Sequence, residues 1–183
     1  AWIEGISERE AAAMIRRWHN ERYRVHPLPE QTKRVDEARR REQIMSGLWL
    51  DSLPLSSTDA SDGRAYLIRR GLSEHWAERT SHVLRYHPQV EYWHAGRKIK
   101  CMRAIIVRLD NPEGKMVGLH RIYIGPQGVY QGLEIPGERK KMLTARRGVL
   151  AGGAIRLNRN YEHTLGIAEG VETALAVMQG TGM

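Results

Sequence analysis

Phenylalanine is absent from this 183-residue sequence, and only one cysteine, Cys101, is present. A single cysteine can form neither a disulfide within the chain nor a cysteine zinc cluster, so we expect it to act as a small buried apolar side chain. No apolar run approaches the roughly 20 residues that a membrane-spanning helix needs, and no signal-peptide pattern opens the chain. These absences predict a cytoplasmic protein with no membrane partner and no zinc site of its own.

Positive charge is what the sequence has in excess. Lys and Arg number 29 against 21 Asp and Glu, which gives a net charge of +8. Such a balance favours a polyanionic partner, and nucleic acid is the first expectation. The alternative is a soluble protein that is merely basic, and composition alone leaves it open. The length supports one domain or two small ones.

Helical signals dominate the first 80 residues. Ser7 and Glu10 have the spacing of a capping box, and a helix with one apolar face is expected after them. Residues 31–43 are rich in charges of both signs, typical of a solvated helix, although Arg39 to Arg41 could also form a phosphate patch. A polar connector over residues 51–61 precedes a short helix that we expect to end at Gly71.

From His82 the apolar residues alternate with a period of two, which predicts strands. Two short strands are expected on either side of Pro88. Residues 102–110 and 115–124 should form an antiparallel hairpin around the turn 111–114. On a half-exposed hairpin, basic side chains can also be plain surface residues, and that alternative stays open here.

The end of the chain contains the most informative stretch. An apolar run over residues 165–168 stops at Glu169 and Gly170, and a helical pattern follows from Val171 to Gln179, with Gly180 as its expected cap. Strand, acidic residue, glycine and helix is the order of a site at the carboxyl end of a parallel strand. The plain alternative is that Glu169 is only the last polar residue before a turn. Glu172 is expected to point away from such a site.

This stretch resembles the first motif of the Toprim domain, the fold shared by bacterial-type primases, type IA and type II topoisomerases and some nucleases. Its version here, Glu-Gly-x-Glu-Thr-Ala-Leu, looks most like primases and primase-helicases of phages, plasmids and integrative elements. The resemblance implies that Glu169 is catalytic and contributes to a magnesium site. That family also has an Asp-x-Asp pair on a later strand, and none follows residue 169 in this sequence. We therefore expect an incomplete metal site and no primer synthesis by this chain alone.

The preceding sequence is ordered like the basic subdomain that precedes Toprim in replicative primases. An arginine stands at the start of one strand. The partner strand contains Gly118 followed by an arginine, and a segment with lysines comes after it. In that family these basic residues hold template and nucleotide phosphates. By position the matches are Arg103, Arg121 and Lys141, with weaker correspondence at His120 and Lys140, and a second basic cluster adds Arg146 and Arg147. Met142 stands where the family has an aromatic residue, so no stacking role is carried over to this position.

Two further segments are similar to these primases. Residues 2–11 resemble the segment just after a zinc ribbon, and residues 57–72 resemble a linker upstream of Toprim. We therefore predict an α+β chain in three parts: a helical N-terminal region (1–56), a mixed basic subdomain with an antiparallel hairpin (57–160), and the first strand and helix of a Toprim fold (161–183).

The predicted function is that of part of a DNA primase, which makes short RNA primers on single-stranded DNA for a mobile element. Its expected partners are the template strand, ribonucleoside triphosphates and a replicative helicase, fused or separate, and magnesium is the expected cofactor of the full-length enzyme. Two alternatives stay open. One is a Toprim nuclease or topoisomerase, and the other is a non-catalytic module that binds single strands or docks a helicase.

Overall fold

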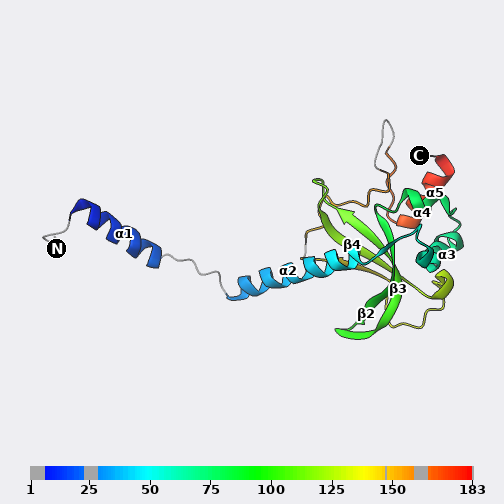
Figure 1. Ribbon diagram of the computed structural model, residues 1–183, viewed down its shortest axis with the longest axis horizontal. Helices are drawn as coiled ribbons and strands as arrows, with labels where there is room; N and C mark the ends of the chain where they lie inside the picture. The colour runs from blue at the N-terminus through cyan, green and yellow to red at the C-terminus, as the bar shows by residue number, and fades with distance from the viewer. Residues whose placement is uncertain (1–6, 23–28, 147, 159–164, 183) are drawn as a thin grey trace. The chain divides into compact units, whose positions relative to one another are not determined.

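The computed structural model describes residues 7–22, 29–146, 148–158 and 165–182. The chain divides into two compact units, residues 1–36 and 37–183. The first unit contains helix α1 (Glu8–Arg22) and the beginning of helix α2 (Pro29–Leu50). The second contains the remaining elements (Figure 1). Mixed α+β architecture, as the sequence predicted, is confirmed. The three-part division at residues 56 and 160 stays a prediction.

Helix α1 begins with the predicted capping box. The backbone N–H and the hydroxyl of Ser7 donate to Glu10 Oε2 at 2.9 and 2.8 Å, and the Glu10 N–H returns a bond to Ser7 Oγ at 3.4 Å. These contacts satisfy donors that a helix start leaves without intrahelical partners. The same bonds to Ser7 lower the pKa of Glu10.

The second unit is built around one five-stranded antiparallel sheet in the order β1-β2-β3-β4-β5. Its strands are β1 (Leu53–Pro54), β2 (Leu84–His94), β3 (Arg97–Asp110), β4 (Met116–Ile124) and β5 (Lys140–Thr144). The predicted hairpin is present, because β3 and β4 pair from Arg103 opposite Ile124 to Asp110 opposite Met116. The predicted pair of strands around Pro88 is in fact the single strand β2, and Pro88 lies where the β2–β3 register shifts between His87 and Val90. A register shift accommodates a residue without an N–H donor.

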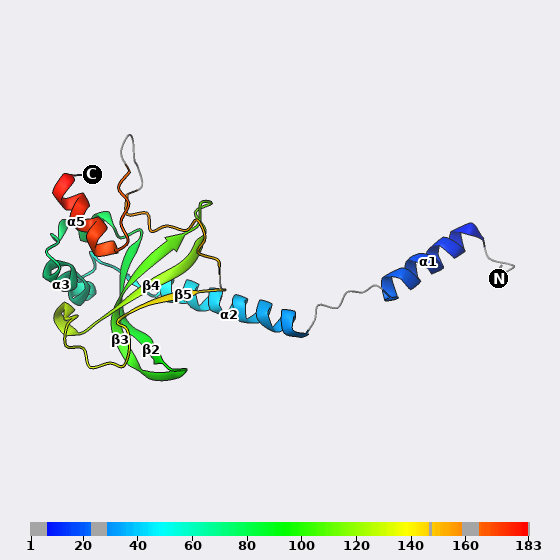
Figure 2. The same ribbon diagram turned by 180° about the vertical axis from the view of Figure 1, so that it is seen from behind.

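Each face of the sheet has its own core. On one face, Tyr66 and Leu67 of helix α3 (Ser61–Arg69) and Leu175 of helix α5 (Val171–Thr181) pack against the strands, and we call this the α3–α5 face. On the other, Met45 and Trp49 of α2 pack on the sheet, and we call this the α2 face. Figures 1 and 2 show α3, the short helix α4 (His75–Arg79) and α5 gathered on one side of the strands.

On the α3–α5 face, two segments far apart in sequence, the turn after β4 and helix α3, are in direct backbone contact. Gly128, in the 3-10 turn η2 (Pro126–Gly128) after β4, has a φ of +72°, and an added Cβ there would lie 2.1 Å from the backbone nitrogen of Tyr66. Only glycine fits both this conformation and this approach. Helix α3 itself ends as predicted, with Gly71 at φ +80°.

Three predicted details are wrong. Residues 165–168 form no strand, and the exposed fractions of Leu165 and Ile167 are 65% and 90%. A strand needs a hydrogen-bonding neighbour, and none of the five strands pairs with this segment. Helix α5 continues through Gly180 and is capped by Gly182 at φ 74°. Cys101 is exposed rather than buried.

Within the described ranges, no helix combines the length and the apolar character needed to cross a bilayer.

Candidate functional site

The basic residues singled out in the sequence lie on opposite faces of the sheet. Arg103 and Lys140 contact residues of α3 and α5. Arg121 and Lys141 are register partners on β4 and β5, and both lie against tyrosines of the α2 face. Side chains alternate between faces along a strand, so the side chains of the adjacent residues Lys140 and Lys141 lie on opposite faces of the sheet. The structure therefore does not bring Arg103, Arg121 and Lys141 into one cleft.

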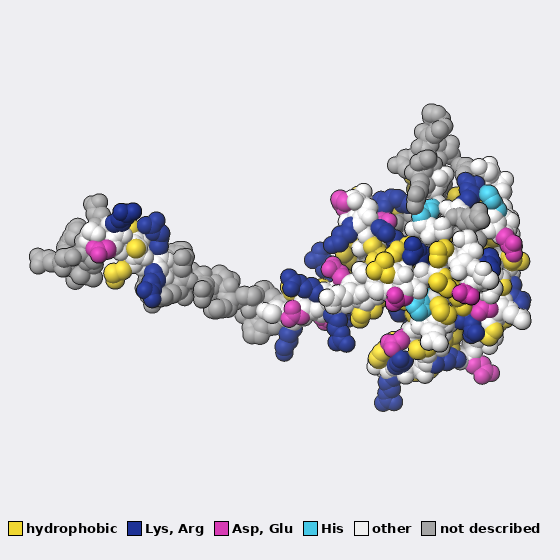
Figure 3. Space-filling model, viewed as in Figure 1, with side chains coloured by type: hydrophobic (Ala, Val, Ile, Leu, Met, Phe, Trp, Pro, Cys, Tyr) yellow, Lys and Arg dark blue, Asp and Glu magenta, His cyan; other side chains and the backbone are white. Residues whose placement is uncertain are grey.

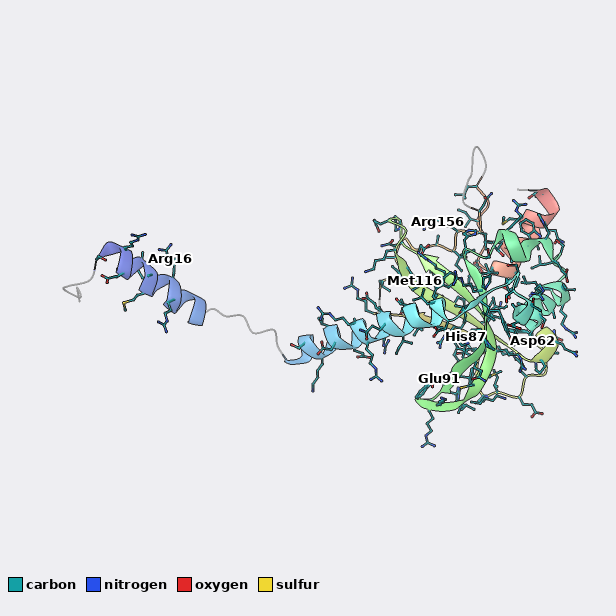
Figure 4. The ribbon with its side chains drawn as sticks, viewed as in Figure 1. Arg16, Asp62, His87, Glu91, Met116 and Arg156 are labelled. Carbon is teal, nitrogen blue, oxygen red and sulfur yellow. The ribbon has the colours of Figure 1, made fainter. Side chains whose placement is uncertain are left out.

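On the α3–α5 face, Arg103 is engaged by a carboxylate of α3. Its Nε donates to Asp62 Oδ2 at 2.6 Å, and the same carboxylate accepts bonds from the Tyr86 hydroxyl at 3.2 Å and from the Gln127 backbone N–H at 2.6 Å. Asp62 therefore ties together α3, two strands and the turn after β4, and its place on the α3 side of the sheet is labelled in Figure 4. The positive charge of Arg103 is compensated within the chain.

The most buried carboxylate of this face is Glu172, in the first turn of α5. Its Oε1 accepts a bond from the Tyr66 hydroxyl at 2.5 Å and an ion-pair contact from Lys140 Nζ at 2.7 Å, and its side chain is 8% exposed. Burial raises the pKa of a carboxyl group, but the bonds from Lys140 and Tyr66 outweigh it, and the pKa of Glu172 is lowered. Burial and the same carboxylate raise the pKa of Tyr66. Glu172 thus joins α5 to α3 and to strand β5.

The other end of α5 is held in a similar way. Gln179 Oε1 accepts bonds from the Ser73 backbone N–H at 2.8 Å and from Trp76 Nε1 at 3.1 Å, and its Nε2 donates to the Gly71 carbonyl at 3.1 Å. Glu172 and Gln179 are two helical turns apart and share one side of the helix. Helix α5 is therefore fixed at both ends on the α3–α5 face.

His120 lies on β4 beside this polar cluster. Burial lowers the pKa of His120, the Lys140 ammonium and Arg121 lower it further, and Glu172 opposes them. A histidine with this shift is neutral at pH 7. It offers no fixed positive charge for a phosphate at that pH.

The cations of the α2 face have aromatic and carbonyl partners. Arg121 lies 5.8 Å from the Tyr123 ring centroid, and its Nε is buried without a hydrogen-bond partner. Lys141 Nζ lies 4.0 Å from the Tyr92 ring centroid and donates to the carbonyl of Trp93. Among the described residues, neither Arg121 nor Lys141 forms an ion pair. Their positive charge is therefore not compensated by a carboxylate.

Further along this face, two arginines lie over Trp49. The guanidinium carbons of Arg85 and Arg108 are 4.4 and 5.9 Å from the indole centroid. Arg108 also pairs with Asp110 at 2.6 Å, whereas Arg85 donates to the Trp49 carbonyl at 3.1 Å. Ring faces attract cations without neutralising them, so the α2 face keeps net positive charge.

The predicted catalytic residue Glu169 is exposed and directly precedes Gly170, the N-cap of α5. No group of three or more His, Cys, Asp or Glu side chains able to hold a metal is found among the described residues. Arg146 is exposed after β5, and Arg147 lies outside the described residues.

The sequence interpretation missed the residues that organise both faces. The sequence analysis assigns no role to Tyr66, Asp62 or Trp93, and it predicts that Glu172 points away from the site. For Trp93 a signal existed, because residues 91–100 combine two adjacent aromatics with three basic residues around a turn. For Glu172 no signal existed, because its partners are 106 and 32 residues away.

The fold and these contacts define an α+β domain with a curved antiparallel sheet and one cationic face. The chain belongs to the family described as a domain of unknown function (DUF7146), which matches residues 38–157, about two thirds of the chain. The match includes the whole sheet and ends before Glu169 and α5. Neither the curated proteins nor the solved structures contain a match to this chain.

Proposed function

We propose that this chain binds single-stranded DNA as the template-holding part of a Toprim-type DNA primase. The observation that carries the proposal is the pair formed by Arg121 and Lys141 on the α2 face, two adjacent cations without a carboxylate partner in the described structure. A guanidinium and an ammonium side by side suit a phosphodiester, because the first offers a planar fork and the second a point charge. Arg103, which Asp62 engages, is left out of this surface.

The chemistry of a template strand fits this surface. A phosphodiester backbone repeats one negative charge per nucleotide, and binding to Lys and Arg releases condensed counterions. The net charge of +8 attracts such a partner from a distance, and the rigid strands hold the two cations in fixed positions. Contacts of this kind give affinity with little sequence preference.

The link to primases rests on the order of the motifs and on one contact. Lys140, the first residue of β5, pairs with Glu172, three residues after Glu169. The helix that follows the Toprim-like motif therefore packs on β5, the strand that also contributes Lys141 to the template surface on the other face of the sheet. Primer synthesis from ribonucleoside triphosphates, a helicase partner and a cytoplasmic location are part of this proposal. Catalysis by Glu169 with magnesium stays a prediction.

The test is fluorescence anisotropy of a labelled oligodeoxythymidylate titrated with the chain over a salt series. We expect binding at low salt that weakens as salt rises, with a slope of about −0.7 for each phosphate contact to a single strand. Mixed-sequence oligonucleotides should bind equally well. No binding at low salt, or binding that ignores salt, contradicts the proposal.

A second candidate, a single-strand-binding module without catalysis, is favoured by one observation. The segment before Glu169 pairs with none of the described strands. Primer synthesis separates the two candidates, measured as labelled ribonucleotide incorporation in a longer protein that supplies an Asp-x-Asp pair. For a primase, Glu169→Gln abolishes synthesis and keeps DNA binding, because an amide can neither ionise nor transfer a proton.

A further inference from the structure

The far end of the β2–β3 ribbon is an exposed, basic arm. Every residue from Trp93 to Cys101 is exposed, and residues 91–101 contain three basic side chains against one carboxylate. Figure 3 shows Lys or Arg side chains projecting from this lower end of the second unit, and Figure 4 labels Glu91 on the ribbon. Nothing in the proposed template surface on β4 and β5 requires such an arm.

Trp93 is held in a defined position on this arm although it is exposed. Its Nε1 donates to Glu91 Oε2 at 3.0 Å, and Glu91 Oε1 pairs with Lys98 Nζ at 2.5 Å. The exposed fraction of Trp93 is 46%, whereas Trp49 and Trp76 are 8% and 3% exposed. One carboxylate thus fixes both an indole ring and a neighbouring ammonium, while the ring keeps much of its surface open to a ligand.

The arm is continuous with the proposed phosphate surface. Lys141 Nζ donates to the Trp93 carbonyl and lies over the Tyr92 ring. Lys100, opposite Tyr92 in the ribbon, reaches the Glu134 carbonyl at 3.4 Å in the segment that leads to β5. The Trp93 indole lies on the same side of the ribbon as Glu91, opposite to the Tyr92 ring, so a strand whose phosphates lie on Arg121 and Lys141 reaches the indole by passing over the edge of the ribbon.

We propose that the arm is a second contact site for the same single strand, and that Trp93 stacks on an unpaired base while Arg97 and Lys100 attract the flanking phosphates. This inference rests on the proposed function and adds a base contact to it. Stacking on an indole is open to any base, because every base has a π face, and it needs a base that is not paired in a duplex. A net charge of +2 over residues 91–101 suits a phosphate backbone and opposes a basic partner.

The test compares two fluorescein-labelled oligonucleotides of equal length, about 16 nucleotides. One is oligodeoxythymidylate, and the other has the same phosphates but abasic sugars. We expect Trp93→Ala to weaken binding of the thymidylate at least about fivefold, the lower end of measured base-stacking contributions. On the abasic strand the wild type and Trp93→Ala should bind alike. Trp93→Tyr keeps an aromatic ring and should retain most of the affinity.

The matched control is Ile99→Ala, which truncates another exposed apolar side chain of the same arm and should leave both affinities unchanged. Thermal unfolding of each variant confirms that the fold is intact. Wild-type binding that Trp93→Ala does not alter, or that it weakens equally on the abasic strand, overturns the base contact and leaves the proposed function standing. No wild-type binding to either strand overturns both.

Discussion

Each face of the sheet carries an arginine and a lysine, but these side chains have carboxylate partners on one face and not on the other. On the α3–α5 face, Arg103 and Lys140 pair with Asp62 and Glu172 at 2.6 and 2.7 Å. On the α2 face, Arg121 and Lys141 lie over tyrosine rings without a carboxylate partner in the described part of the chain. The first arrangement uses charge to join helices to strands, and the second leaves charge available to a ligand. Residue type alone therefore does not identify a binding site, because the neighbour across the fold decides its use.

The largest expected effect follows from removing the carboxylate that organises the first face. Glu172→Ala leaves the buried Tyr66 hydroxyl without an acceptor and Lys140 without its counter-charge. We expect a loss of about 2 kcal/mol in the free energy of unfolding, less than for a fully buried pair because water reaches Lys140. Urea unfolding measures it.

The control for this variant is Glu169→Ala, which removes an exposed carboxylate three residues earlier. It should change the free energy of unfolding by less than about 0.5 kcal/mol. Equal stability of the two variants would mean that Glu172 is not what holds α5 to the sheet.

The second prediction addresses the other face. Replacing Arg121 and Lys141 together by Ala should weaken single-strand binding roughly tenfold at low salt and make its salt dependence shallower by about 0.7 per lost phosphate contact. Arg103→Ala, the matched removal of a carboxylate-paired cation, should leave affinity nearly unchanged. Anisotropy titrations measure both variants. An Arg103→Ala effect as large as that of the double variant would erase the distinction between the faces.

A smaller effect is expected from pH. The pKa of Glu172 in the folded protein lies below its ordinary value of 4.5, so the unfolded chain takes up the proton more readily. The stabilisation is therefore present above pH 4.5 and is lost as pH falls through the folded-state pKa. Urea unfolding between pH 7 and lower values should show a shallower loss for Glu172→Gln than for the wild type.

His120, on the same face, should affect the free energy of unfolding in a higher pH range than Glu172 does. Its folded-state pKa lies below 6.5, so between the two values the unfolded chain binds more protons and stability falls as pH drops from 6.5. His120→Gln should remove this part of the slope and leave the Glu172 part in place. A wild-type slope unchanged by either substitution would exclude both groups as its source.

The smallest effect on stability and affinity is expected from a variant that removes the carboxylate partner of Arg103, so that this cation of the α3–α5 face resembles those of the α2 face. Asp62→Asn removes the counter-charge of Arg103 and keeps an oxygen that can accept a bond from the Gln127 N–H. We expect an unfolding free energy within about 1 kcal/mol of the wild type. Single-strand affinity should rise slightly, since one arginine is no longer compensated. Unchanged affinity would mean that a strand on the α2 face does not sense this charge.

Local patterns in the sequence were enough to predict several elements. The capping box at Ser7 and Glu10, the C-cap at Gly71 and the hairpin around residues 111–114 depend on neighbouring residues, and all are present. The placement of Arg103 and Arg121 on opposite faces of the sheet could also be predicted from the sequence. Arg121 pairs with Ile106, three residues from Arg103 on the same strand, and an odd spacing places two side chains on opposite faces.

The rest depends on contacts between distant segments. The bonds from Tyr66 and Lys140 to Glu172 follow from how α3, β5 and α5 meet, and no spacing within one element encodes them. The strand expected over residues 165–168 has a suitable apolar pattern, but a strand forms only beside another strand. Cys101 was expected inside because of its residue type, and its place on a projecting ribbon exposes it.

The contact of Gly128 with the backbone of Tyr66 has a practical consequence for anyone who wants to attach a probe to this protein. The segment around Gly128 and the helix it touches have no room between them, so a tag, a dye or an inserted peptide there would push them apart. Gly114 also has a positive φ, but no atom lies within 4 Å of the Cβ it lacks. The turn between β3 and β4 is therefore the place for a reporter, with asparagine at position 114 as a conservative first change.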